Sequence, residues 1–156
     1  MPRHFAAKPD PASSLVIPNG VSALRRMSVW LDASIRRLDV PERLLFRFDL
    51  CANEAVSNII AYAYPENGAR EIALRLYREK DALCLEIEDD GVAFNPLERP
   101  RHAQPESLAD AEVGGLGVDL IRSFMDECHY ARREGRNILR MVARVGTGRI
   151  EPLEPD

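Results

Sequence analysis

The sequence predicts an α+β domain, and three observations lead to this class. Apolar residues recur every three or four positions through two segments near the N-terminus, which is the period of an amphipathic helix. They alternate with polar residues in later segments that come in pairs around short polar turns, as the strands of hairpins do. The length of 156 residues suits one domain with a single core.

The N-terminal half predicts a strand and two helices. The short stretch Ser-Leu-Val-Ile at 14–17 is mainly apolar and stops at Pro18, which favours a short strand. Apolar residues then recur at helical spacing over 21–38, which predicts the first helix. A second helix is expected over 41–64 and begins at Pro41, because the first turn of a helix tolerates a missing N–H.

The C-terminal half predicts two hairpins separated by a loop and a helix. Apolar and polar residues alternate over 72–77 and 83–88, so the first hairpin should bury one face. The proline-rich segment 95–113 is longer than most loops in compact domains, which is typical of a lid or a binding segment. The remaining elements are a helix at 117–126 and strands at 128–133 and 137–145.

Composition narrows the classes of function. Apolar residues make up 46% of the chain and charged residues 29%, as in a soluble globular protein. Lys and Arg number 21 against 25 Asp and Glu, so the net charge is −4 and direct binding of nucleic acid is not expected. The N-terminus lacks the apolar core of a signal peptide, and no run approaches the roughly 18 apolar residues of a membrane span. We therefore expect a cytoplasmic protein with no membrane partner.

Two further features are interpreted as structural. Prolines and glycines at both ends predict flexible tails over 1–12 and 146–156, around a folded domain at 13–145. The cysteines are odd in number, far apart and without a Cys-x-x-Cys pair or a histidine at ligand spacing. We interpret them as reduced, mostly buried thiols with no metal or redox role; they are Cys51, Cys84 and Cys128.

Glu54 and Asn58 form the first candidate site. They stand one turn apart in the second helix and share a narrow polar stripe with Arg47, while the rest of that helix is apolar and should be largely buried. Such a stripe is often only a solvated helix face. The functional interpretation is a general base beside a metal-binding amide, because Mg²⁺ takes oxygen ligands and usually only one or two from protein.

Asp89 ends the first hairpin and is the second candidate. Strand alternation places it on the buried face and directs Asp90 toward solvent, together with Glu86. A buried carboxylate needs a donor, which the backbone of its own Asp-Gly turn can supply. Alternatively, it accepts a hydrogen bond from a ligand amine such as the adenine amino group, with Gly91 and Ala93 keeping the wall low for a flat ring.

The third candidate is the run Gly-Gly-Leu-Gly-Val at 114–118, which opens the helix expected at 117–126. Glycines before a helix let the backbone approach an anion and direct free N–H groups at it. A flexible lid hinge explains the run about as well. It is not a P-loop, since no Gly-Lys-Ser/Thr follows, nor a dinucleotide fingerprint, since no strand closely precedes it.

The order of these elements resembles the GHKL ATPase superfamily. The resemblance covers residues 14–145 and implies a two-layer α/β sandwich, with helices packed on one face of a mixed, mostly antiparallel sheet. The run Glu-Ala-Val-Ser-Asn at 54–58 matches the N-box of that superfamily. This match implies Glu54 as the catalytic base and Asn58 as a ligand of both Mg²⁺ and the nucleotide.

The two glycine boxes of the superfamily extend the resemblance. Asp89 stands at the adenine-reading position of the first box and Gly91 follows it, while Ala93 occupies a position where glycine is more common. The second box, beside the ATP lid, implies four residues that contact the nucleotide: Gly115, Leu116, Gly117 and Val118.

Two regions depart from the family pattern. The superfamily often has Gly-Thr before its last strand, where this chain has Gly-Arg-Asn at 135–137. Asn137 can still donate a hydrogen bond from this position. The lid lacks the threonines of some relatives, so the resemblance assigns no lid residue, although Arg99 and Arg101 could reach phosphates instead of remaining solvated.

Within the superfamily, the small size and the run Ile-Ile-Ala-Tyr-Ala-Tyr at 59–64 are most similar to bacterial anti-sigma-factor serine kinases. This branch implies an ATP-binding, Mg²⁺-dependent serine/threonine-protein kinase that acts as an anti-sigma regulatory factor. Its implied partners are ATP and ADP, a sigma factor and a small anti-anti-sigma protein, on which it phosphorylates a serine. Such relatives are commonly dimers, which favours a homodimer.

Two alternatives remain for the same pocket. One is an anti-sigma module that sequesters its partner without kinase activity, with nucleotide only shaping the binding surface. The other is a GHKL ATPase in which Glu54 activates water, although such enzymes generally need a second domain to respond to turnover. A sensor histidine kinase is disfavoured because no histidine lies in a dimerising helical hairpin; the histidines are His4, His102 and His129.

Overall fold

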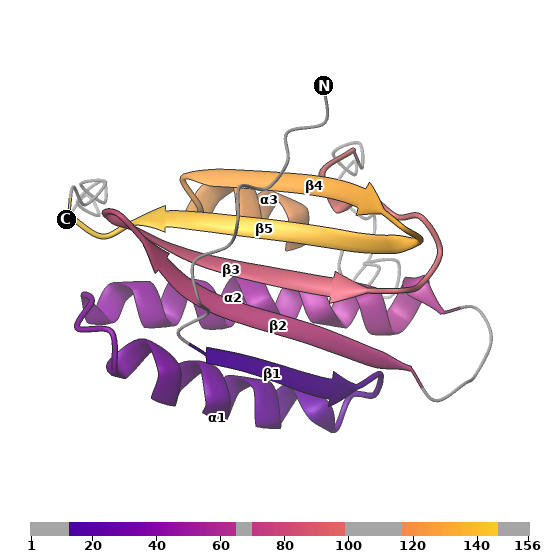
Figure 1. The fold of residues 1–156 in the computed structure, drawn as a ribbon, viewed down its shortest axis with the longest axis horizontal. Helices are drawn as coiled ribbons and strands as arrows, with labels where there is room; N and C mark the ends of the chain where they lie inside the picture. The colour runs from indigo at the N-terminus through magenta and orange to yellow at the C-terminus, as the bar shows by residue number, and fades with distance from the viewer. Residues whose placement is uncertain (1–12, 65–69, 99–116, 147–156) are drawn as a thin grey trace, which may run out of the picture.

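Helices cover one face of an antiparallel sheet (Figure 1). The computed structural model describes residues 13–64, 70–98 and 117–146. The strands are β1 (Ser13–Pro18), β2 (Glu71–Glu79), β3 (Ala82–Asp89), β4 (Glu127–Arg133) and β5 (Arg136–Arg144), in the spatial order β1-β2-β3-β5-β4. The α+β class and the layered arrangement are confirmed. Among the described residues every strand pair is antiparallel, so the expected mixed sheet has no parallel pair there.

The helices lie near the positions that the sequence predicts. They are α1 (Ala23–Arg36), α2 (Glu42–Asn58) and α3 (Gly117–Phe124), with short turns η1 (Ile59–Ala63) and η2 (Pro96–Glu98). Figure 1 shows all three helices on the far side of the sheet, with α1 next to β1 and α3 behind β4 and β5. The tails expected over 1–12 and 146–156 lie outside the described residues, apart from Gly146.

The second helix corrects two expectations. It does not continue as an α-helix to residue 64, because its last turn, η1, has π-helical hydrogen bonding. It is also less buried than its apolar pattern suggested, since the side chain of Phe46 is 65% exposed. The spacing of apolar residues indicates only roughly which face of a helix is buried. It does not distinguish an α-turn from a π-turn.

The hydrophobic core lies between the helices and the inner face of the sheet. The antiparallel register pairs Leu74 with Ile87 and Leu76 with Leu85, and all four side chains are almost completely buried. Since side chains alternate across a strand, the same register sends every second residue of β3 inward. This alternation ends with Asp89, which pairs with Asn137 of β5 at the edge of the core.

The outer face of the sheet buries a charged side chain that the sequence analysis placed in solvent. Glu86 is only 2% exposed, and its Oε2 accepts a hydrogen bond from the Tyr77 hydroxyl at 2.8 Å. Arg140 donates to the same hydroxyl at 2.9 Å and pairs with Glu79 at 3.0 Å. The expectation for Glu86 was wrong because neighbouring strands supply polar partners that alternation within one strand does not reveal.

The structure confirms that the cysteines are mostly buried. Cys51 and Cys84 are fully buried, and Cys128 is half-buried. Burial raises the pKa of Cys51 to about 12 and that of Cys128 to about 11, so these thiols stay protonated and unreactive at neutral pH. No helix among the described residues is long and apolar enough to cross a membrane.

Candidate functional site

Two of the predicted site residues meet in one small cavity. It lies between the end of α2, the η1 turn and the inner face of β3 and β5, and its polar lining consists of Asn58, Asp89, Tyr130 and Asn137. The rest of the lining is apolar or aromatic and includes Phe94. The cavity volume is about 20 Å³, which is enough for about one water molecule.

Asn58, the last residue of α2, carries an unpaired polar group into this cavity. Its side chain is 2% exposed, and neither Oδ1 nor Nδ2 has a hydrogen-bond partner among the described residues. It caps no helix with its side chain. A buried polar group without a partner costs roughly 1–3 kcal/mol, so this amide is not explained by stability. The interpretation as a solvated stripe is therefore wrong for Asn58.

Glu54 lies one turn before Asn58 on α2. Its side chain is half-buried, and its carboxylate accepts no hydrogen bond from the described residues. It is not among the residues that line the cavity. Residues four apart on a helix have Cβ atoms about 5–6 Å from each other, so this carboxylate is available beside the amide of Asn58.

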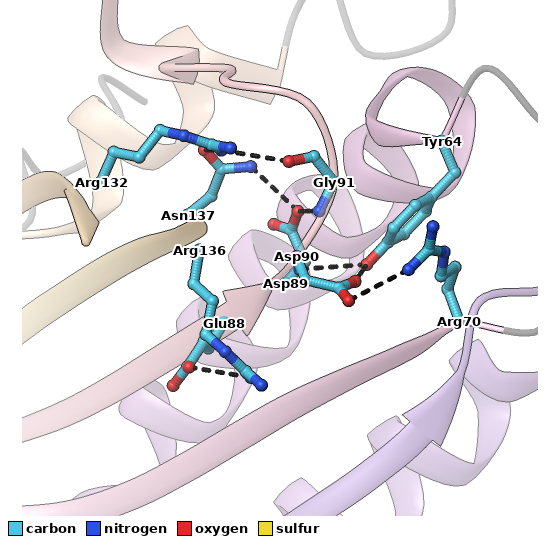
Figure 2. A network of polar contacts seen from close by, with 9 residues as sticks. All are labelled: Tyr64, Arg70, Glu88, Asp89, Asp90, Gly91, Arg132, Arg136 and Asn137. Carbon is cyan, nitrogen blue, oxygen red and sulfur yellow. Dashed lines mark hydrogen bonds and ion pairs between the residues drawn. The ribbon is translucent and has the colours of Figure 1, made fainter. Parts of the chain in front are cut away.

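Asp89 is buried, as alternation predicted, while Asp90 is exposed. The Oδ1 atom of Asp89 accepts hydrogen bonds from the Gly91 N–H at 2.9 Å and from Asn137 Nδ2 at 3.0 Å (Figure 2). Burial raises the pKa of Asp89, and these two donors partly offset the shift. The Asp-Gly turn is therefore formed through Oδ1. The second oxygen of Asp89, Oδ2, accepts no hydrogen bond from the described residues.

A second set of contacts holds the turn after β3 from the side of η1. The Tyr64 hydroxyl donates to Asp90 Oδ1 at 3.0 Å, and Arg70 pairs with Asp90 Oδ2 at 3.3 Å. Figure 2 shows Tyr64 and Arg70 on the opposite side of Asp89 from Arg132 and Asn137. The buried carboxylate thus lies between two groups of polar side chains.

Gly91 has a packing role that the sequence analysis did not foresee. A Cβ atom at this position would lie 2.4 Å from the carbonyl oxygen of Ala63, and the next residue, Val92, donates its N–H to the same oxygen at 2.9 Å. Glycine is required because the turn packs directly against η1. Gly91 and the exposed Ala93 are not among the residues that line the cavity, so the structure does not place them as a wall for a flat ring.

Asn137 is more deeply involved than the sequence suggested. It is 4% exposed, and its Nδ2 donates to Asp89 Oδ1 at 3.0 Å and to the Val92 carbonyl at 2.8 Å. Its Oδ1 accepts from Tyr130 at 2.5 Å and from Arg132 at 2.9 Å. No sequence pattern points to Tyr130 and Arg132, because only the pairing of β4 with β5 brings them to this amide.

The segment after the turn covers the cavity. Phe94 and Pro96 line it, and the Phe94 ring stacks on Tyr62 with 6.2 Å between ring centroids. Arg122 of α3 donates a short hydrogen bond to the carbonyl of Leu97, which ties this segment to α3. The loop residues Arg99 and Arg101 lie outside the described residues.

The glycine turn is described only in part. The helix expected at 117–126 is confirmed by α3, which begins at Gly117 and includes Val118 in its first turn. Gly115 and Leu116 lie outside the described residues. Among the described residues, no three histidine, cysteine or carboxylate side chains are grouped as metal ligands.

Comparison with known proteins points to one family. Residues 17–143 match the histidine kinase-like ATPase domain. The serine/threonine-protein kinase BtrW of Bordetella bronchiseptica is 35% identical over 114 residues, which cover 73% of this chain and 80% of that protein. An anti-sigma F factor of Clostridium perfringens is 26% identical over 113 residues, or 71% of this chain and 81% of that protein.

Solved structures share the fold. A Mycobacterium tuberculosis structure with RsbU and RsbW domains matches with a TM-score of 0.57 and 12% identity, over 85% of this chain and 32% of that chain. A blue-light activated histidine kinase of Erythrobacter litoralis matches with a TM-score of 0.50 and 21% identity, over 69% of this chain and 32% of that chain. At these identities the likeness concerns the fold, and this chain spans only part of either longer protein.

Proposed function

Because this chain belongs to the histidine kinase-like ATPase domain family, we propose that it is an ATP-dependent protein serine/threonine kinase that acts as an anti-sigma regulatory factor. One observation carries the proposal most directly. Two buried polar side chains of the same cavity, Asn58 and Asp89, both retain hydrogen-bonding atoms that no described residue uses. The similarity to a serine/threonine-protein kinase and to anti-sigma F factors supports the choice of reaction and partner class.

Asp89 is proposed to recognise adenine. Its Oδ1 is occupied by two protein donors, while Oδ2 can accept a hydrogen bond from the exocyclic amino group. Guanine carries a carbonyl oxygen at the corresponding ring position, and that oxygen would face a carboxylate. The apolar lining around Ile87 and Leu139 suits the faces of a purine ring. We therefore expect adenine nucleotides to be preferred over guanine nucleotides.

Asn58 is proposed to hold Mg²⁺. An amide oxygen is a suitable hard ligand for this ion, and the unpaired Oδ1 of Asn58 meets that requirement without any rearrangement of protein hydrogen bonds. When bound, Mg²⁺ would neutralise charge on the phosphates of ATP. The remaining ligands would come from phosphates and water, in agreement with the absence of a carboxylate cluster among the described residues.

Glu54 is proposed to act as the general base. Its half-buried carboxylate lies one helical turn from Asn58 and is not engaged in a hydrogen bond with the described residues. In the proposed step, the oxygen of a serine hydroxyl bonds to the γ-phosphorus of ATP, the bond from that phosphorus to the bridging oxygen breaks, and ADP leaves. The carboxylate of Glu54 takes the hydroxyl proton.

The glycine turn is proposed to hold the phosphates. Residues Gly115, Leu116, Gly117 and Val118 precede or begin α3, and the first N–H groups of a helix have no partner within it. These N–H groups carry partial positive charge and suit an anion. In a chain with a net charge of −4, such local neutralisation is needed for ATP to bind.

The cavity must widen before a purine can enter, because its volume of about 20 Å³ accommodates only about one water molecule. The covering segment that starts at Phe94 is the wall that we expect to move, since the opposite wall is formed by α2 and by the paired strands β3 and β5. We propose that this segment, of which residues 94–98 are described, shifts outward when ATP binds.

A phosphotransfer assay tests the proposal. The protein is mixed with γ-labelled ATP, Mg²⁺ and candidate anti-anti-sigma proteins, and the labelled residue is identified by mass spectrometry. Label on a partner serine is the expected result. Tight binding of a partner without transfer would instead support a sequestering module, and release of inorganic phosphate without a labelled protein would support a hydrolysing ATPase.

A further inference from the structure

The amide of Asn137 can adopt only one orientation. Its Oδ1 accepts from three donors, namely the Phe94 N–H, the Tyr130 hydroxyl and the Arg132 guanidinium, at 3.3, 2.5 and 2.9 Å. Its Nδ2 donates to Asp89 and to the Val92 carbonyl. A flipped amide would place an NH₂ group against three donors, so the hydrogen-bond pattern excludes it.

Asn137 has no bonding capacity left for a ligand. An amide NH₂ has two donors, and both are used within the protein, while its oxygen already accepts more bonds than it has lone pairs. Any influence of Asn137 on a bound nucleotide therefore passes through Asp89. Figure 2 shows the amide between Arg132 and the carboxylate of Asp89.

The contacts of Asn137 determine which oxygen of Asp89 remains available. Nδ2 of Asn137 and the N–H of Gly91 both bind Oδ1, which leaves Oδ2 as the acceptor for a ligand. Arg132 strengthens this arrangement, since the same Nη1 donates to Asn137 Oδ1 at 2.9 Å and to the Gly91 carbonyl at 3.1 Å. One guanidinium thus contacts both residues that donate to Asp89.

We propose that Asn137, held by Arg132, is the positioning residue that keeps Asp89 oriented as a hydrogen-bond acceptor for the adenine amino group. The proposal rests on the nucleotide site proposed above and adds a residue that does not itself touch the nucleotide. It also assigns a function to the place where this chain has Asn instead of the more common threonine. The amide of Asn137 donates to Asp89 and accepts from β4 at the same time. A threonine hydroxyl has only one hydrogen to donate, so it can make fewer of these hydrogen bonds.

The test uses Asn137→Asp, which preserves shape and the acceptor oxygen but replaces the donor to Asp89 with a second oxygen. When both carboxyl groups are ionised they repel each other, so ATP affinity should fall by about 10- to 100-fold relative to the unmodified protein. At lower pH one proton enters the pair and replaces the lost N–H donor, so the ratio of the two affinities should return toward one. The affinities are measured by calorimetry from pH 5.5 to 8.5.

Other titratable and charged groups face the pair in both proteins. Asp90 follows in the chain, Tyr130 and Arg132 face the amide from β4, and the hydroxyl of Tyr64 approaches from η1. The matched control is Arg136→Gln, because Arg136 neighbours Asn137 but pairs with Glu88 at 3.2 Å and is 55% exposed. This control should leave the ATP affinity and its pH profile unchanged.

A second measurement covers the case in which Asn137→Asp does not fold at high pH. In Arg132→Gln, the preference for ATP over inosine triphosphate should decrease, while the affinity for inosine triphosphate, which lacks the amino group, should remain. Equal loss of affinity for both nucleotides would overturn the positioning role, as would a pH-independent affinity ratio for Asn137→Asp. If the unmodified protein itself binds no ATP, the proposed nucleotide site fails, and not merely the role of Asn137.

Discussion

The amide of Asn58 destabilises the folded state, because its buried Oδ1 and Nδ2 atoms have no hydrogen-bond partners among the described residues. Asn58→Leu, of similar volume, should therefore raise the free energy of unfolding by about 1–3 kcal/mol and abolish Mg²⁺-dependent binding of ATP. Urea unfolding and calorimetry measure the two effects. Asn53→Leu is the matched control on the same helix and should be destabilised, because Asn53 donates to Ser28 and to the Asp49 carbonyl. A similar loss of stability in both variants would contradict this account.

Asp89 makes stability depend on pH. Burial raises its pKa above the ordinary value of 3.8, so between pH 3.8 and this raised pKa the folded protein binds more protons than the unfolded chain. The free energy of unfolding therefore decreases as pH rises from 3.8 through the raised pKa, and the loss of stability is complete above that pKa. Asp89→Asn removes the titration, so its free energy of unfolding relative to the unmodified protein should increase from pH 3.5 to pH 8. A relative decrease, measured by urea unfolding, would mean that the native contacts lower the pKa.

At the scale of elements, the close packing of the β3 turn on η1 sets the shape of the site. Gly91→Ala places a Cβ atom 2.4 Å from the carbonyl oxygen of Ala63 and 2.9 Å from its carbonyl carbon, and these backbone atoms cannot rotate away as a flexible side chain could. We expect a loss of about 1–3 kcal/mol in the free energy of unfolding and weaker ATP binding. Gly146→Ala is the control, since a Cβ there meets nothing within 4 Å. Unfolding by urea should separate the two variants, and equal stabilities would show that η1 yields easily.

The covering segment controls access to the cavity. The Phe94 ring stacks on Tyr62, and a stacked aromatic pair contributes about 0.5–1.5 kcal/mol beyond its buried area. If this segment must shift before ATP enters, Phe94→Ala should raise the association rate constant for ATP by up to about tenfold. Stopped-flow fluorescence with a labelled nucleotide gives that rate constant. Val92→Ala is a suitable control because Val92 is 48% exposed and does not line the cavity. An unchanged rate constant for Phe94→Ala would show that entry takes another path.

The elements were predictable where the evidence is local. Period-two alternation placed Asp89 inside and Asp90 outside, and the structure confirms both. The π-turn after Asn58 was not predictable, since α- and π-turns place apolar residues on similar faces. Glu86 was assigned to solvent because its hydrogen-bond partner, the Tyr77 hydroxyl, belongs to another strand, as does Arg140, which donates to that same hydroxyl.

For the whole molecule, the order of motifs predicted the fold, which is confirmed, and the assignment of the nucleotide site stays a prediction. The polar contacts of the candidate site depend on strand pairing between distant segments. The network around Asn137 joins the β3 turn to β4 and β5, and the register that brings Tyr130 and Arg132 to it is set by hydrophobic packing across the sheet. No pattern within one segment reveals such a contact. The residues of the glycine turn before Gly117 remain predictions, since they lie outside the described residues.

The central claim is that Glu54, one helical turn from the cavity residue Asn58, acts as the base in phosphotransfer to a protein, while the cavity itself binds the nucleotide. Glu54→Gln tests it most directly, because the amide keeps the shape of the side chain but cannot take the serine proton. Two quantities are measured on the same sample: the dissociation constant for ATP and the rate of label transfer to a partner serine. The expected result is an unchanged dissociation constant with transfer slowed by about 10²- to 10⁴-fold. Transfer at the rate of the unmodified protein would contradict the account.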